Sequence, residues 1–114
     1  MRNGPRIFYV TPNQMKPEGS NVTLSCKFET VDEETTYWWY HGQEEKNSSL
    51  YSKALVKKLP DGLEVIEHML TIKNVSREDQ GEYRCRARNK IKPSDTLKTY
   101  LTVTTITGQY LVSV

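Results

Sequence analysis

The sequence has no long hydrophobic run: of its 114 residues, 36% are hydrophobic and 26% are charged, in short interspersed stretches. A membrane-spanning helix needs about 20 consecutive apolar residues, and no stretch of the sequence provides them. The segment after Met1, RNGPRIFYV, also lacks the apolar core of a secretory signal peptide. We therefore expect either an intracellular chain or a piece of a larger protein whose targeting segment lies elsewhere.

An excess of one charge is also missing, because 16 basic and 14 acidic side chains leave a formal net charge of +2. That balance gives no electrostatic reason to expect nucleic acid as a partner. A chain of this length forms one domain with a single core, without needing a metal or an oligomer to fold.

Reactive and metal-binding motifs are absent as well. The cysteines, Cys26 and Cys85, form no Cys-x-x-Cys pair, and the sequence holds neither a serine-nucleophile motif nor a phosphate-binding glycine loop. The histidines have no metal-ligand spacing, so we expect His41 at the end of a strand and His68 at the surface or half buried in a strand. The sequence predicts no enzyme, no cofactor and no metal site.

Short alternating runs separated by turn residues predict an all-β sandwich or barrel. Pro12 and Pro17 should divide the first strand into two edge pieces, and the sequence Pro60-Asp61-Gly62 predicts a hairpin turn. The segment from Leu50 to Leu55 leaves room for an extra edge strand. The side chains that the alternation directs inward are Val22, Leu24, Cys26, Phe28, Leu70, Ile72, Tyr83, Cys85, Ala87, Leu101 and Val103.

Two inward-pointing cysteines in an all-strand domain predict a buried disulfide between Cys26 and Cys85. Closing so long a loop in the unfolded chain would stabilise the fold by about 4 kcal/mol, and such bonds persist in oxidising compartments. The alternative is a pair of reduced cysteines packed as small hydrophobic side chains. Three Asn-x-Ser/Thr sequons, at Asn21, Asn47 and Asn74, fit the oxidising alternative, since they predict exposed N-glycosylation sites.

Four motifs together resemble the immunoglobulin superfamily. The run DQGEYRC, Asp79 to Cys85, is similar to its Asp-x-Gly-x-Tyr-x-Cys signature, and a tryptophan follows Cys26 at the family spacing. The runs EGSNVTLSC and LTIKNV are similar to two further strands of the family. The resemblance implies two antiparallel sheets in a Greek key, joined by the Cys26–Cys85 disulfide.

The residues of this segment, taken with the resemblance, predict local roles. Tyr83 would form a tyrosine corner, Asp79 with Ser76 would cap one helical turn, and Gly81 would turn the chain into the next strand. Asp79 would pair with a basic residue, for which the candidates are Lys53, Lys57 and Lys58.

The cysteine spacing fits an intermediate-type (I-set) domain best and a variable-like domain second. We expect one domain over residues 1–105. Residues 106–114 are expected to be a linker to a following domain or an added edge pairing.

The run TTYWWYHG places two tryptophans side by side, and neighbouring side chains of a strand point to opposite faces. One register buries Trp38 with Thr36 and Tyr40, and the other buries Trp39 with Tyr37 and His41. A one-residue slip inverts every side chain. We favour Trp39 in the core, which turns Trp38 outward.

In the immunoglobulin topology, the tryptophan strand lies beside the strand of the second cysteine. Three arginines there point outward by alternation, so a candidate binding face gathers Trp38, Tyr40, Arg84, Arg86, Arg88 and Lys98. Stacking of guanidinium groups over the indole would make this face merely structural. Trp, Tyr and Arg are also the residues enriched at binding hot spots, and a small apolar area rimmed by positive charge suits an acidic protein surface or an acidic glycan.

The sequence therefore predicts an extracellular recognition or adhesion module of a multidomain cell-surface protein. Its expected partner is another protein, a homophilic contact with a second copy included, or an acidic glycan, and not nucleic acid. The alternative is an intracellular structural I-set domain of a muscle-type giant scaffold protein, with reduced cysteines and unused sequons.

Overall fold

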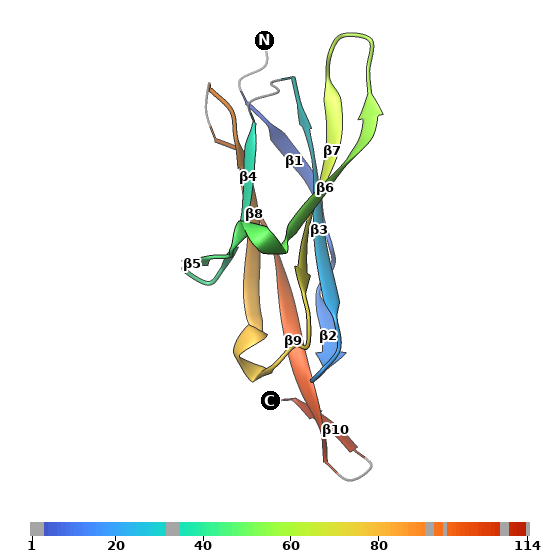
Figure 1. The fold of residues 1–114 in the computed structure, drawn as a ribbon, viewed down its shortest axis with the longest axis vertical. Helices are drawn as coiled ribbons and strands as arrows, with labels where there is room; N and C mark the ends of the chain where they lie inside the picture. The colour runs from blue at the N-terminus through green and yellow to red at the C-terminus, as the bar shows by residue number, and fades with distance from the viewer. Residues whose placement is uncertain (1–3, 32–34, 91–92, 95, 108–109, 114) are drawn as a thin grey trace.

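The computed structural model describes residues 4–31, 35–90, 93–94, 96–107 and 110–113. Two β-sheets face each other across one core (Figure 1). The strands are β1 (Arg6–Val10), β2 (Gln14–Pro17), β3 (Val22–Thr30), β4 (Thr36–His41), β5 (Glu44–Glu45), β6 (Tyr51–Lys58), β7 (Glu64–Ile72), β8 (Gly81–Arg88), β9 (Leu97–Thr107) and β10 (Tyr110–Ser113). Two short 3-10 helices are η1 (Ser48–Leu50) and η2 (Arg77–Asp79).

One sheet has four strands in the order β1-β3-β7-β6, and the other has six, in the order β10-β9-β8-β4-β5 with β2 added beside β9. All strand pairs are antiparallel except β2 with β9. The predicted all-β immunoglobulin-like sandwich is therefore correct. Pro12 lies between β1 and β2, which belong to different sheets, so the first strand is divided as the sequence predicts.

The core is formed by the inward side chains that alternate along the central strands. On β3 and β7 the register pairs Leu24 with Leu70 and Phe28 with Ile66, all buried. Such pairs of apolar side chains from long alternating strands stabilise the sheet and fix its register. The hydrophobic periodicity of the sequence is thus sufficient to identify the core strands.

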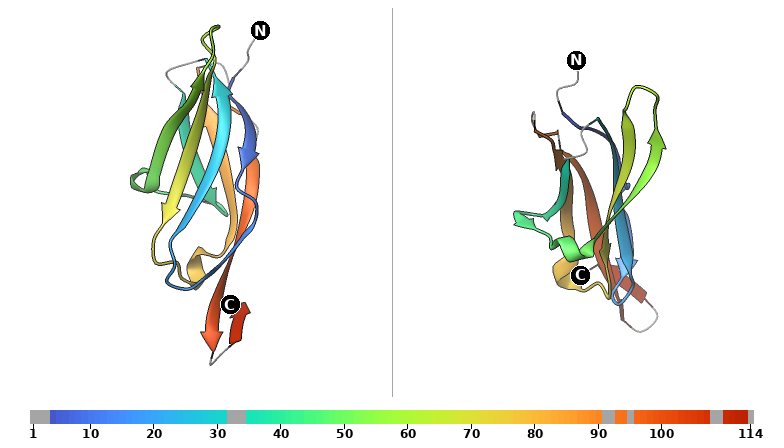
Figure 2. Two further views of the ribbon diagram at one scale, coloured as in Figure 1. Left: turned by 90° about the vertical axis from the view of Figure 1, so that its right-hand side faces the viewer. Right: turned by 45° about the horizontal axis from the view of Figure 1, so that its top comes forward.

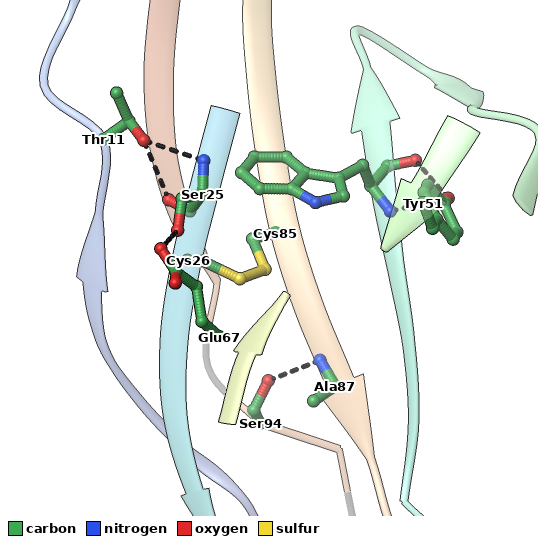
Figure 3. Close-up of a disulfide and its surroundings, with 9 residues drawn as sticks. Thr11, Ser25, Cys26, Tyr51, Glu67, Cys85, Ala87 and Ser94 are labelled. Atoms are coloured by element: carbon green, nitrogen blue, oxygen red, sulfur yellow. Dashed lines mark hydrogen bonds between the residues drawn. A yellow bond between two sulfur atoms is a disulfide. The ribbon is translucent and has the colours of Figure 1, made fainter. Parts of the chain in front are cut away.

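A disulfide between Cys26 on β3 and Cys85 on β8 joins the two sheets, and both cysteines are buried (Figure 3). On one side of the bond, the Ser25 hydroxyl donates a hydrogen bond of 2.5 Å to the carboxylate of Glu67, and Thr11 exchanges hydrogen bonds with the Ser25 backbone. On the other side, Ser94 accepts a hydrogen bond of 2.9 Å from the Ala87 amide.

The edge strand predicted around Leu50 to Leu55 is present in the structure. Residues 51–58 form β6, the edge of the four-stranded sheet, where β6 and β7 form the hairpin expected at Pro60-Asp61-Gly62. The added strand is β5, whose two residues pair with the end of β4. The sequence did not indicate which sheet the strand at 51–58 joins, because alternation identifies a strand but not its neighbours.

The end of the chain extends the six-stranded sheet. Strand β9 continues to Thr107 and pairs with β10, from Tyr110 opposite Thr107 to Ser113 opposite Thr104. Figure 2 shows this hairpin projecting beyond the end of the sandwich. Residues 104–107 and 110–113 therefore form an added edge pairing.

Candidate binding face

The structure places the two tryptophans of β4 on opposite faces. Trp39 has an exposed fraction of 0% and lies in the core, whereas Trp38 is half-buried on the outer face. Trp39 is opposite Cys85 in the register, and its amide donates a hydrogen bond of 2.9 Å to the Tyr51 hydroxyl. That hydroxyl in turn donates to the Lys46 carbonyl, so β4 is tied to the beginning of β6.

His68 lies in the core, not at the surface or half buried as the sequence suggested. Its exposed fraction is 2%, and the rings of Tyr37, Trp39 and Tyr51 lie 5.4, 6.2 and 4.8 Å from the imidazole. Burial lowers the pKa of His68 from 6.5 to about 4, and the nearby Lys53 ammonium acts in the same direction. The prediction failed because the rings that enclose His68 come from strands of both sheets. The alternation along β7 alone does not reveal them.

The tyrosine corner joins η2 to β8. The buried Tyr83 donates a hydrogen bond of 2.5 Å from its hydroxyl to the Asp79 carbonyl, and burial raises the pKa of that hydroxyl. The His41 ring stacks on Tyr83 with a centroid distance of 4.4 Å, and a Cβ added at Gly81 would lie only 3.0 Å from its Nε2 atom.

Asp79 caps its own helical turn. The Ser76 amide donates a hydrogen bond of 2.8 Å to the Asp79 carboxylate, as the capping pattern predicts. Within the described residues, Asp79 forms no ion pair with the three lysines of β6 that the family resemblance suggested. The capping bond already gives this carboxylate a hydrogen-bond donor, so the expected ion pair is not needed.

The outer face of β4, β8 and β9 brings together the six residues predicted for a binding face, which we call the arginine face: Trp38, Tyr40, Arg84, Arg86, Arg88 and Lys98. The register pairs Trp38 with Arg86 and Tyr40 with Arg84, while Thr36 is opposite Arg88. Residues paired across antiparallel strands share a face. The arginines therefore lie beside the aromatic rings rather than around the edge of the sheet.

Arg84 has internal partners. Its guanidinium lies 4.8 Å from the Tyr40 ring centroid and donates a hydrogen bond of 3.0 Å to the Gly42 carbonyl. Glu82 lies 4.0 Å from Arg84 and 3.8 Å from Lys98. Part of the arginine face is thus a structural cation–π and ion-pair network.

Arg86, Arg88 and Trp38 are different. Within the described part of the chain, neither Arg86 nor Arg88 forms an ion pair. The Nε1 atom of Trp38 and the Nε atom of Arg86 are buried and have no hydrogen-bond acceptor there, and the Nε atom of Arg84 shares this state although its Nη2 atom donates to the Gly42 carbonyl. A buried donor without an acceptor costs roughly 1–3 kcal/mol, so this part of the face would gain from a ligand that supplies acceptors.

Two acidic residues next to the arginine face were not singled out in the sequence. Glu82 belongs to β8, two residues before Arg84, and Glu45 belongs to β5, directly opposite Tyr40. The alternation along β8 could have identified Glu82. Glu45 could not be found in this way, because a two-residue strand has no recognisable periodicity.

All three sequon asparagines are exposed, and each lies outside the strands of the arginine face. Asn47 accepts a hydrogen bond of 2.8 Å from the Ser49 amide, and Asn21 accepts one of 3.0 Å from the Asn74 amide. Both of these bonds use the side-chain oxygen, so the amide nitrogens that would carry a glycan are not held by them.

Among the described residues, no group of three or more His, Cys, Asp or Glu side chains is placed to hold a metal ion. None of the helices in the described ranges is long and apolar enough to cross a membrane.

Comparisons with known proteins agree with this architecture. The sequence model of the immunoglobulin domain matches residues 5–89. A solved structure of the titin kinase and its flanking domains is 27% identical, covering 88% of this chain and 17% of that one, with a TM-score of 0.63. An I-band fragment of titin is 24% identical, covering 90% of this chain and 33% of that one, with a TM-score of 0.69.

The N-terminal eight immunoglobulin domains of the Down syndrome cell adhesion molecule are 24% identical, covering 89% of this chain and 12% of that one, with a TM-score of 0.63. The chain thus spans at most 33% of the length of these three solved chains. A search of curated protein sequences finds no match.

Proposed function

This chain belongs to the immunoglobulin domain family, and we propose that it is an extracellular recognition module that binds a protein partner through the arginine face. The single observation that carries the proposal is that Trp38 and Arg86, on the outer face of the sheet, have buried hydrogen-bond donors without an acceptor. Trp and Arg are enriched at binding hot spots. A partner with carboxylates at its surface would supply the missing acceptors.

An extracellular location is supported by the buried disulfide and by the exposed sequons. Disulfides persist in oxidising compartments and are rare in the cytosol. Because the sequons lie outside β4, β8 and β9, glycans there would leave the arginine face accessible. The division of the first strand between the two sheets and the short β5 support the assignment to the I-set.

Charge reversal tests the binding face. Replacement of Arg84, Arg86 and Arg88 by Glu should abolish binding in a cell-surface binding screen while the circular dichroism spectrum stays unchanged. A matched control reverses three exposed lysines away from the face, Lys57, Lys58 and Lys73, and should keep binding. Binding that survives the arginine reversal would make the face purely structural, and competition by a sulfated glycan would identify a glycan as the ligand instead.

The second candidate is an intracellular structural domain of a giant scaffold protein, which the similarity to the domains of titin favours. Expression in secreting eukaryotic cells separates the two candidates. The extracellular proposal expects a mass increase from N-glycans, removed by a glycosidase, and no free thiol. Failure of secretion with two free thiols would favour the scaffold domain.

A further inference from the structure

A pocket opens at the edge of the sandwich, and none of the six residues of the arginine face lines it. It lies where η1 meets the beginning of β6, the end of β7 and η2, and its volume is about 610 Å³. Pockets of about 300–1,000 Å³ are typical of small-ligand sites. We propose that this pocket binds an acidic sugar unit, one that carries a carboxylate or a sulfate group.

The strand pairing explains why the pocket forms at this place. Strand β6 begins with Tyr51 opposite Leu70, so within the described residues β7 has no neighbouring strand on this side at Thr71 and Ile72. Both of these residues line the pocket, and η1, which directly precedes β6, contributes to the lining as well. The pocket is therefore a consequence of where the pairing between β6 and β7 stops.

Two lysines give the pocket an excess of positive charge. Lys46 precedes η1, Lys73 follows β7, and both line the pocket. Within the described residues, neither ammonium group forms an ion pair. The acid in the lining is Asp79, whose carboxylate already accepts the hydrogen bond from the Ser76 amide. A concave surface with an excess of one charge attracts ligands of the opposite charge, so the pocket favours an anion.

The rest of the lining matches a sugar ring. Ser49, Ser52 and Thr71 contribute to it, and each carries a hydroxyl group that can both donate and accept hydrogen bonds. Sugar hydroxyls have the same dual capacity. Leu50 and Ile72 add apolar surface, on which the C–H groups of a sugar ring can pack. A carboxylate or sulfate on that ring would then reach the two ammonium groups.

An acidic peptide fits the same place less well. A peptide that binds by adding a strand needs a sheet edge several residues long. The open edge of β7 beside β6 offers only Thr71 and Ile72. A compact ring with hydroxyl groups uses the pocket better than an extended chain does.

Titration of the isotope-labelled, disulfide-bonded domain, followed by its amide NMR signals, tests the proposal. A glycosidase first removes N-glycans, because Asn47 directly follows Lys46 and a glycan there would hinder access. The probes are a sulfated disaccharide from heparin, the carboxylated disaccharide of hyaluronan, and the neutral disaccharide lactose. An acidic disaccharide should shift the signals of Ser49, Ser52 and Lys73, whereas lactose should not. The tighter-binding of the two acidic probes identifies sulfate or carboxylate as the group recognised.

Two variants locate the binding in the pocket. Lys73→Glu should weaken binding of the acidic disaccharide at least tenfold, because it reverses one of the two charges. Ser52→Phe should weaken it equally by filling the pocket without a change of charge. The matched control is Lys58→Glu, at an exposed lysine of β6 outside the pocket, and it should bind like the wild type. Circular dichroism checks that each variant remains folded.

The proposal is overturned if no localised shifts appear, if lactose shifts the same signals, or if binding survives both pocket variants. An equal loss in the Lys58→Glu control would also overturn it, since the attraction would then be non-specific. Binding of a short Glu-rich peptide at these residues, without binding of any sugar, would assign the pocket to an acidic protein segment instead. Because the pocket shares no residue with the arginine face, none of these outcomes bears on the proposed function.

Discussion

Gly81 connects η2 to β8 at a position where two constraints exclude a larger side chain. Its φ of +139° lies in a region that L residues rarely adopt, and an added Cβ would lie 3.0 Å from the His41 Nε2 atom. The His41 ring cannot easily move away, because it stacks on Tyr83 and its Nε2 atom lies 2.9 Å from the Gln80 carbonyl oxygen. Both the backbone conformation and the nearby His41 ring thus favour glycine at position 81, the glycine of the family signature.

Replacement of Gly81 by Ala should lower the free energy of unfolding by about 2–3 kcal/mol, from backbone strain and the contact with His41 together. The matched control is Gly62→Ala, because Gly62 has a φ of +90° but no atom within 4 Å of an added Cβ. That variant should lose only the strain contribution, about 1 kcal/mol. Urea denaturation followed by tryptophan fluorescence measures both losses, and equal losses would contradict the steric contribution.

Protonation of His68 should lower the free energy of unfolding as the pH falls. Its pKa is about 4 in the folded chain against 6.5 when unfolded, so the unfolded state binds more protons in this interval. The stabilisation is complete above pH 6.5 and is lost as the pH falls toward 4, by about 3 kcal/mol in total. Urea denaturation across this interval should show the loss, and the variant His68→Leu should remove it. An equal pH dependence in the variant would assign the effect to the carboxylates instead.

At the scale of the elements, β4 is the strand in which fold and candidate function meet. One side of it contributes Trp39 to the core, and the other contributes Trp38 and Tyr40 to the arginine face. Because alternate residues serve the two roles, a change on one face should leave the other face in place.

The two tryptophans provide the test of this division. Trp39→Ala should lower the free energy of unfolding by about 3–5 kcal/mol, as expected for a large side chain removed from a packed core. Trp38→Ala should lower it by less than about 1 kcal/mol, because its indole is half-buried and surface substitutions cost little. Chemical denaturation measures both, and a larger loss for Trp38 would mean that the arginine face is chiefly structural.

At the scale of the whole molecule, the disulfide joins the two sheets near the centre of the core. It connects residues 59 positions apart in the sequence, so it removes a large part of the freedom of the unfolded chain. The hydrogen bond from the Trp39 amide to the Tyr51 hydroxyl joins β4 of one sheet to β6 of the other, and the tyrosine corner holds η2 against β8.

Replacement of Cys26 and Cys85 by Ala together should lower the free energy of unfolding by about 4 kcal/mol on the chain-entropy model. Urea denaturation of the oxidised wild type and of the double variant gives the difference. The wild type unfolded in the presence of a reducing agent serves as the control and should behave like the variant. A double variant as stable as the oxidised wild type would contradict a role of the disulfide in stability.

The sequence by itself determined the fold class, the core strands, the disulfide partners and the outward direction of the three arginines of β8. Each of these follows from alternation or from short motifs, because a strand's periodicity and a turn's chemistry are local properties of the chain. Alternation along β8 was enough to turn Arg84, Arg86 and Arg88 to one side once Tyr83 and Cys85 were directed inward.

The tertiary structure alone decided which sheet β6 joins, that His68 is enclosed by rings, and that Glu45 lies beside Tyr40. It also separated Trp38 from Trp39, since both registers of β4 were compatible with the sequence. These features depend on contacts between strands far apart in the chain. Such contacts arise from packing two sheets together, so a local pattern of residues does not contain them.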